Sequence, residues 1–287
     1  MKQLLIISGK GGTGKTTLAT AFIKLAEADT FADCDVEAPN LHLLLHLSGE
    51  TQISDYYGMD KAIIDTNRCI GCGLCAEHCR FDAISKVNNH YQVEIYSCEG
   101  CGVCEIICPE KAVSMEKTVS GRLELYKNDF VFSTAQLRMG YGVSGKLVAS
   151  VKKQLLDEVT AADLIIIDGS PGIGCPVIAS LSGVDLALIV TEPSISAISD
   201  LERIVRTAKI FEVDTAVCIN KYDIDLDNSN RIQSLCEREN IEIVGRIPFD
   251  ETVLEAVNNQ KSIIDYHCDA ADAVKEVWEN LVKLLVE

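Results

Sequence analysis

Eight cysteines crowd into one short stretch of the chain and form two copies of the same spacing. Cys69, Cys72, Cys75 and Cys79 recur 29 positions later as Cys98, Cys101, Cys104 and Cys108. The flanking glycines repeat with them, which identifies a duplicated unit. The N-terminus shows no export signal, so we expect a cytoplasmic protein whose reduced thiols are metal ligands rather than disulfide partners.

The spacing C-x₂-C-x₂-C-x₃-C resembles the run found in bacterial ferredoxins with two 4Fe-4S clusters, where each fourth cysteine ligates the other cluster. The resemblance implies a first cluster on Cys69, Cys72, Cys75 and Cys108, and a second on Cys98, Cys101, Cys104 and Cys79. The alternative is zinc, which usually takes two separated Cys-x-x-Cys pairs. In one departure from the pattern, Arg80 follows Cys79 where Pro109 follows Cys108, which predicts a different turn after the first run and a more polar setting for its cluster.

A phosphate-binding loop is the second chemical feature. Gly9 to Thr16 match G-x-x-x-x-G-K-S/T between an apolar strand and a helical segment. Lys15 is expected to bridge the β- and γ-phosphates and the Thr16 hydroxyl to hold Mg²⁺. The backbone amides that would close around the phosphates belong to Gly9, Gly11, Gly12, Thr13 and Gly14. We therefore expect ATP and Mg²⁺ as cofactors, the alternative being a glycine turn without a ligand.

Two aspartates lie where such a site needs carboxylates. Asp168 ends the apolar run that begins at Leu164, and a glycine-containing loop follows it, as expected of a Walker B aspartate. Asp35 follows the segment expected to be the second strand. The alternative for each is an acidic residue in solvent at the end of a strand.

The loop also carries a family resemblance. The sequence Lys10-Gly11-Gly12-Thr13-Gly14-Lys15-Thr16-Thr17 is similar to the deviant Walker A motif of the MinD/ParA/nitrogenase-iron-protein class of P-loop ATPases. This resemblance implies an ATP-sandwiched homodimer in which Lys10 reaches the partner's nucleotide. It assigns Asp35 to switch I and Asp168 to switch II. It also implies that Asn220 reads adenine and that the loop Pro248-Phe249-Asp250 flanks the base.

Cys175 lies seven residues after Asp168. The nitrogenase iron protein has a cluster-ligating cysteine at a similar offset on its dimer-facing surface, so an intersubunit metal site is one interpretation. Ordinary packing in the switch loop is the other, because one cysteine per chain supplies too few thiolates for a cubane.

The surrounding elements predict an α/β fold. Short apolar runs alternate with segments of helical period, the pattern of a doubly wound, mostly parallel sheet with ligands at the carboxyl ends of its strands. The expected strands are 4–8, 164–168, 185–191, 215–220 and 241–247, and 15–28 is expected to be helical. We expect a P-loop core in two parts, 1–59 and 119–287, interrupted at 60–118 by a small α+β ferredoxin-like unit.

Composition restricts the partners. The formal charge of −17 argues against a protein that mainly binds nucleic acid. An acidic, amphipathic segment from Ala270 to Val286 predicts a helix packed on the sheet rather than a membrane-binding one, since membrane surfaces are anionic. No run long enough to span a membrane is visible.

The combination resembles MinD-superfamily ATPases with an inserted ferredoxin unit, whose relatives are associated with cluster assembly and anaerobic redox systems. The leading hypothesis is a slow ATPase whose nucleotide state controls electron transfer or cluster delivery to a redox or metallocluster-recipient protein. Because the insertion follows shortly after Asn40 to Leu45, motion of the switch loops would reach the clusters directly. The alternatives are a scaffold or carrier for metallocluster assembly, and a MinD-like spatial regulator with redox-sensing clusters.

Overall fold

The computed structural model describes residues 1–47, 50–159 and 162–286. Within them, one large sheet has the strand order β13-β12-β11-β1-β10-β2-β9-β8-β3. The strands from β13 to β9 run parallel, and β8 and β3 are antiparallel additions at one edge. In chain order the strands are β1 Lys2–Ser8, β2 Thr30–Asp33, β3 Glu50–Tyr57, β8 Val119–Lys127, β9 Val131–Leu137, β10 Leu164–Pro171, β11 Leu186–Thr191, β12 Asp214–Asn220 and β13 Glu242–Ile247.

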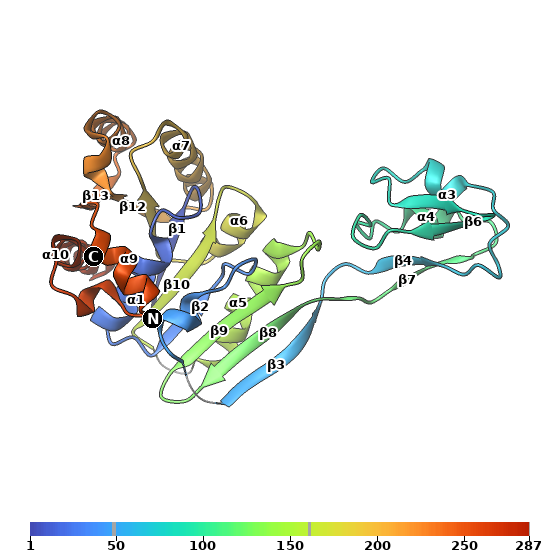
Figure 1. Cartoon of the computed structure of the whole chain (residues 1–287), viewed down its shortest axis with the longest axis horizontal. Helices are drawn as coiled ribbons and strands as arrows, with labels where there is room; N and C mark the ends of the chain where they lie inside the picture. The colour runs from blue at the N-terminus through green and yellow to red at the C-terminus, as the bar shows by residue number, and fades with distance from the viewer. Residues whose placement is uncertain (48–49, 160–161, 287) are drawn as a thin grey trace.

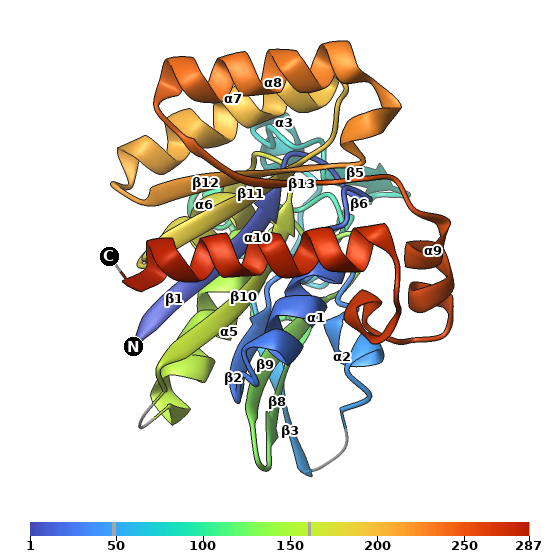
Figure 2. The ribbon, with the colours of Figure 1, turned by 90° about the vertical axis from the view of Figure 1, so that its left-hand side faces the viewer.

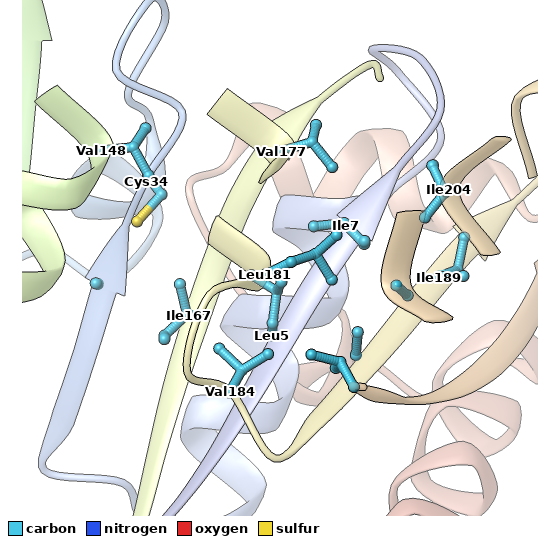
Figure 3. Packing of buried hydrophobic residues seen from close by; sticks show 14 of the residues in the cluster. Leu5, Ile7, Cys34, Val148, Ile167, Val177, Leu181, Val184, Ile189 and Ile204 are labelled. Carbon is cyan, nitrogen blue, oxygen red and sulfur yellow. The ribbon is translucent and has the colours of Figure 1, made fainter. Parts of the chain in front are cut away.

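Helices cover both faces of the sheet because the central strands are apolar on both sides. In β1, Leu5 and Ile7 face one buried cluster, whereas Leu4 and Ile6 face the other, as the two-residue period of a strand requires. The first cluster is closed by α5 Ser144–Glu158, α6 Cys175–Leu181, α7 Ile195–Ile210 and α8 Leu226–Glu239. Figure 3 shows part of this cluster, with Leu5 and Ile7 near Val177 and Leu181. The second is closed by α1 Lys15–Leu25, α9 Glu251–Asn258 and α10 Asp269–Val286 (Figure 2).

The predicted doubly wound α/β class is confirmed, and each predicted core strand is present with ends shifted by a few residues at most. The predicted C-terminal helix is α10, whose buried face includes Val274, Val277 and Leu281 and packs beside β13 and α1. Among the described residues, no helix combines the length and the apolar character needed to cross a membrane.

Residues 61–116 build a separate small unit at the end of a long two-stranded arm (Figure 1). The arm is the antiparallel ladder between β3 and β8, which pairs Glu50 with Lys127 and ends where Tyr57 pairs with Val119. The unit contains two antiparallel strand pairs, β4–β7 and β5–β6, and two short helices. Its elements are β4 Lys61–Ile64, α3 Leu74–Glu77, β5 Ile84–Val87, β6 His90–Val93, α4 Val103–Ile107 and β7 Val113–Glu116.

The arm leaves the core at the edge where a parallel sheet binds ligands. Strand β9 runs parallel to β2, so its end at Leu137 lies at the carboxyl edge; the start of β8 and the end of β3 lie there too. The hypothesis that motion of the switch loops reaches the clusters, because the insertion follows shortly after residues 40–45, stays a prediction. Strand β3 separates that segment from the unit, and the loop after β9 makes the contacts between core and unit that are described below.

We predict that Phe22→Ala lowers the free energy of unfolding of the core by about 3–5 kcal/mol, because it empties a fully buried aromatic site. Phe22 lies in α1 with its ring centroid 5.2 Å from that of Trp278 in α10, the single tryptophan of the chain. Denaturant unfolding followed by Trp278 fluorescence measures the effect. The control Ile106→Ala, at a side chain 83% exposed in the inserted unit, should change the transition by less than about 0.5 kcal/mol. Equal losses in both variants would contradict this assignment of the core.

Candidate functional site

The loop between β1 and α1 places Lys15 among three carboxylates. The Lys15 Nζ lies 2.6 Å from the Asp168 Oδ1 and 3.9 Å from the Asp35 Oδ2. Asp33, at the end of β2, completes the group. Three of the predicted site residues, Lys15, Asp35 and Asp168, are thus brought together by β1, β2 and β10, which are neighbours in the sheet.

Burial and charge act in opposite directions on these groups. Burial disfavours the charge on Lys15, but Asp168, Asp33 and Asp35 outweigh it and raise the pKa of the ammonium. Burial, reinforced by Asp168, raises the pKa of Asp33 to about 7, although Lys15 and backbone amides oppose this. Burial also raises the pKa of Asp35, which Lys15 partly offsets. The site therefore holds its lysine charged and has an excess of acid groups.

Asp33 is a site residue that the sequence analysis missed. Its Oδ1 accepts a hydrogen bond from the Asp35 amide at 2.9 Å, and its Oδ2 accepts from the amides of Asn40 at 2.9 Å and Leu41 at 3.0 Å. One buried carboxylate thus fixes both ends of the loop that carries Asp35. The signal was the pair of acids in Asp33-Cys34-Asp35, of which only the second was assigned a role.

Lys10 is held within its own chain in this structure. Its Nζ lies 2.6 Å from the Glu192 Oε1 and 3.1 Å from the Ser194 Oγ. Burial opposes ionisation of Glu192, but Lys10 and Lys221 together lower its pKa. The Lys221 Nζ also donates to the Gly12 carbonyl at 3.1 Å, so Glu192 and Lys221 connect the phosphate loop to β11 and β12. Sequence reasoning identified neither Glu192 nor Lys221.

Asn220 contacts the phosphate loop from the end of β12. Its Nδ2 donates to the Thr13 carbonyl at 2.7 Å, and its Oδ1 accepts from the Lys221 amide at 3.0 Å. Gly14 has φ = 94°, and a Cβ there would lie 2.4 Å from the Asn220 Nδ2. The close approach and the left-handed backbone both require glycine at this position.

The loop 248–250 is positioned by hydrogen bonds of its own. The Phe249 amide donates to the Asp223 Oδ1 at 2.7 Å. Asp250 caps α9 by accepting from the Thr252 amide at 2.9 Å, and hydrogen bonds from Thr252 lower its pKa. Pro248 precedes this capping residue, so the segment that was predicted to flank a base is held between β13 and α9.

The phosphate loop fits a Mg²⁺–nucleotide. Gly12 and Gly14 have positive φ, which turns successive amides of the loop toward a common anion. The Asp168 Oδ2 and the Thr13 Oγ1 are buried without a hydrogen-bond partner among the described residues. Buried polar atoms are nearly always satisfied, so these two are suited to a bound group. Thr16 stands beside Lys15, with its Oγ1 3.5 Å from the ammonium nitrogen.

The cysteines of the first predicted set surround one cavity. It is lined by the thiols of that set, including Cys108 from the second run, and by the apolar side chains of Ile64, Ile70, Leu74 and Val113. Gly71 and Gly73 have positive φ, and their counterparts Gly100 and Gly102 share this conformation. The Cys108 Sγ also accepts a hydrogen bond from the Ala112 amide at 3.2 Å. Four thiols around an apolar cavity fit a 4Fe-4S group.

The second set lies against the small core of the inserted unit. Cys79 of the first run packs there with Cys98, Cys104 and Cys108 of the second run, beside Ala62 and Ala83. Burial and the thiols of Cys98 and Cys101 raise the pKa of Cys104, which places these three close together. Among the described residues, no three His, Cys, Asp or Glu side chains converge on a single metal ion. Cys108 lines the cavity of the first set and Cys79 packs among cysteines of the second run, whereas the exchange of these two cysteines as cluster ligands stays a prediction.

Cys175 lies away from both sets. It begins α6 in the core and is exposed, and its backbone and Cβ lie against Gly145 of α5, where an added Cβ would meet the Cys175 Cβ at 3.0 Å. This arrangement gives Cys175 a packing role at the α5–α6 contact. The intersubunit metal site remains a prediction.

The loop between β9 and α5 connects the core to the inserted unit. The Tyr141 ring is edge-on to Tyr96, with centroids 6.0 Å apart, and the Lys61 Nζ lies 5.1 Å from the Tyr141 ring centroid. A Cβ on Gly140 would lie 2.8 Å from the Tyr96 ring. The Lys146 Nζ lies 3.2 Å from the Met59 Sδ. These contacts, together with the arm, hold the unit at two places.

Comparison with known proteins is consistent with this site. The profile of the CobQ/CobB/MinD/ParA nucleotide binding domain matches residues 4–263. An uncharacterized protein of Methanocaldococcus jannaschii is 32% identical over 99% of this chain and 97% of its own. An iron-sulfur cluster carrier protein of Pyrococcus horikoshii is 26% identical over 99% of this chain and 87% of its own.

A solved structure supports the fold. The septum site-determining protein MinD from Pyrococcus horikoshii, complexed with Mg-ADP, superimposes with a TM-score of 0.59 at 19% identity. The match covers 99% of this chain and 96% of that one. At this identity the likeness establishes a shared α/β architecture.

We predict that Asp33→Asn accelerates amide exchange in residues 35–41 by about tenfold or more, because an amide group cannot accept all three backbone hydrogen bonds. Hydrogen–deuterium exchange with mass spectrometry reads the segment directly. Asp29→Asn is the matched control, since Asp29 is an exposed acid just before the same strand. Unchanged exchange in the Asp33 variant would show that the carboxylate does not organise the loop.

Proposed function

The chain belongs to the CobQ/CobB/MinD/ParA family of nucleotide-binding proteins, and from this we propose that it is an ATP-hydrolysing iron–sulfur protein. In this proposal, the nucleotide state of a homodimer is coupled to electron transfer, or to metallocluster delivery, through two 4Fe-4S clusters. The observation that carries the proposal is that eight cysteines with ferredoxin spacing stand on an arm that leaves the nucleotide edge of the sheet.

The nucleotide half of the proposal rests on the phosphate loop. The amides of residues 10–16 and the Lys15 ammonium would hold the phosphates, and Thr16 with the buried Asp168 would hold Mg²⁺ and its water. Lys15 would exchange its contact with Asp168 for the phosphates. Lys10 would leave Glu192 to reach the partner's nucleotide, which makes its present ion pair the contact that dimerisation must break.

Coupling has a continuous route through backbone hydrogen bonds. The Leu137 amide at the end of β9 donates to the Val36 carbonyl, one residue beyond Asp35, at 2.8 Å. The next amide, Arg138, donates at 2.8 Å to the carbonyl of Ser120, at the end of the β3–β8 ladder that leads to the inserted unit. From there the loop continues to Tyr141, which contacts Tyr96 of the inserted unit. A nucleotide-driven shift of the Asp35 loop is therefore expected to reach the second cysteine run.

The clusters, when bound, would supply one-electron transfer at low potential. The chain's own contribution is to hold the thiolates in two sets, to surround the first set with apolar side chains and to connect the second set to the core. The recipient protein is defined by this chemistry alone, as an acceptor of single electrons or of a cluster.

A carrier for metallocluster assembly is the second candidate. Relatives from three Pyrococcus species named iron-sulfur cluster carrier protein, which are 25–26% identical to this chain, favour it, as does the exposed thiol of Cys175. In this function the inserted clusters would be permanent, and iron beyond about eight per chain would be the cargo.

The proposed coupling predicts that the clusters respond to nucleotide. Anaerobically purified protein should contain about eight irons per chain, and Mg-ATP should shift the EPR spectrum or the reduction potentials of the dithionite-reduced form. Lys15→Ala should keep the iron but lose nucleotide binding, turnover and the ATP response. A full iron complement with no ATP response in the wild type would contradict coupling and favour the carrier function. Turnover at the wild-type rate in Lys15→Ala would refute the assigned phosphate site.

The proposed ligand sets, in which the fourth cysteine of each run binds the cluster of the other run, predict which cluster each cysteine variant loses. Cys108→Ser should lose about half of the iron, and Cys72→Ser should remove the same cluster, because both thiols line one cavity. Cys175→Ser is the control and should retain all of it. EPR identifies the surviving cluster. If Cys108→Ser instead removed the same signal as Cys101→Ser, the crossed ligand sets would be wrong.

A further inference from the structure

Lys61 is a buried cation at the root of the inserted unit. Its side chain is 5% exposed, and its Nζ donates a hydrogen bond to the carbonyl of Cys98. Within the part of the chain that the structure describes, Lys61 makes no ion pair with a carboxylate. Buried charges are normally paired, so an anionic group is expected close to this ammonium. Cys98, whose carbonyl accepts this hydrogen bond, is the first ligand of the proposed second cluster, so the thiolates of that cluster are the expected anions.

Because the unit is duplicated, the residue that corresponds to Lys61 beside the first cysteine run can be identified. Gly100 packs against the carbonyl of Asp60, where an added Cβ would lie at 2.3 Å. Twenty-nine residues earlier, Gly71 packs in the same way against the carbonyl of Asn89, at 2.8 Å. The residue after Asp60 is Lys61, and the residue after Asn89 is His90. Each begins a strand, β4 or β6, so the two halves present an ammonium and an imidazole at matching positions.

The replacement of a lysine by a histidine gives the surroundings of the two cysteine runs different electrostatic potentials. Reduction of a four-thiolate cluster adds one negative charge, and a fixed cation in a buried setting stabilises that charge far more than it would in water. Lys61 supplies such a cation beside the second run. His90 carries no permanent charge, and its Nδ1 is buried without a hydrogen-bond partner among the described residues.

We propose that Lys61 gives the cluster on Cys98, Cys101, Cys104 and Cys79 a higher reduction potential than the cluster on Cys69, Cys72, Cys75 and Cys108. The inference rests on the proposed function, since it requires both clusters. With both clusters bound, a single electron shared between them would reside mainly on the second cluster, and its transfer would leave the first oxidised without moving a proton or changing a bond. That electron would lie toward the core, because Tyr96, two residues before the second run, and Lys61 both contact the Tyr141 ring.

The Tyr141 ring adds to this arrangement from the core side. The ammonium lies 5.1 Å from the ring centroid, within the range of a cation–π contact. Lys61 is therefore held between a carbonyl of the proposed cluster loop and an aromatic ring of the core. The residue that sets the potential is also the residue that the core touches, which places the electron acceptor at the junction of the two parts.

The test is an anaerobic redox titration followed by EPR, on full-length protein whose iron content has been measured. In Lys61→Met, one midpoint should fall while the other stays. The reduced-to-oxidised ratio of that cluster at a fixed poise should drop about tenfold, which is about 59 mV for a one-electron couple. Lys61→Arg keeps the charge and should stay near the wild type. Lys86→Met removes an exposed lysine of β5 and should change neither midpoint.

The possible outcomes distinguish a failure of this inference from a failure of the proposed two-cluster function. Lys61→Met with a full iron complement and two unshifted midpoints overturns the role of Lys61 and leaves the two-cluster function intact. Wild-type protein without cluster iron overturns both. If Lys61→Met fails to bind its clusters, His90→Lys tests the inference instead. A cation added at the matching position should raise the lower midpoint potential and narrow the difference between the two midpoints. An unchanged difference overturns the inference.

Discussion

Three carboxylates and one lysine meet at the carboxyl ends of adjacent strands, and much of the molecule is arranged around this imbalance. Lys15 is buried with Asp168 at 2.6 Å, and Asp33 and Asp35 complete the group. Negative charge in excess at a buried site disfavours a free polyphosphate and favours one that arrives with Mg²⁺. The same acids fix the backbone, since Asp33 holds the loop of Asp35 by three amides. A change in the charge of Asp33 is therefore expected to change the position of the loop that carries Asp35.

The sequence predicted the parts of this site that depend on local patterns. The phosphate loop, the central strands and the repeated cysteines are each defined by spacing along the chain, and the structure places Lys15, Asp35 and Asp168 together. Glu192 and Lys221 could not be predicted in this way, because they meet the loop only through pairing of β1 with β11 and of β11 with β12. The roles of Lys10 and Asn220 toward nucleotide stay predictions, as does the division at residues 60 and 118.

Strand β3 was missed for a different physical reason. Seven of its eight residues are exposed or half-buried, with Tyr56 as its one buried side chain, so its sequence lacks the alternation that identifies a strand with a covered face. It exists because β8 offers it a partner over its whole length. Strand β8 itself pairs with β9, whose residues 132–135 are buried in the core. The arm is therefore anchored through its second strand, and its outer strand is specified by pairing rather than by burial.

The pairing of Tyr57 with Val119 has a consequence for how such a molecule can arise. Opposite residues of an antiparallel ladder have Cα atoms only about 5 Å apart, the separation that a tight turn closes. The 61 residues between them could be exchanged for a turn, and the ladder and the nine-stranded sheet would keep their register. In evolutionary terms the cysteine-bearing unit is a cassette: a lineage can gain, lose or replace it in one recombination event while the nucleotide site stays under unbroken selection.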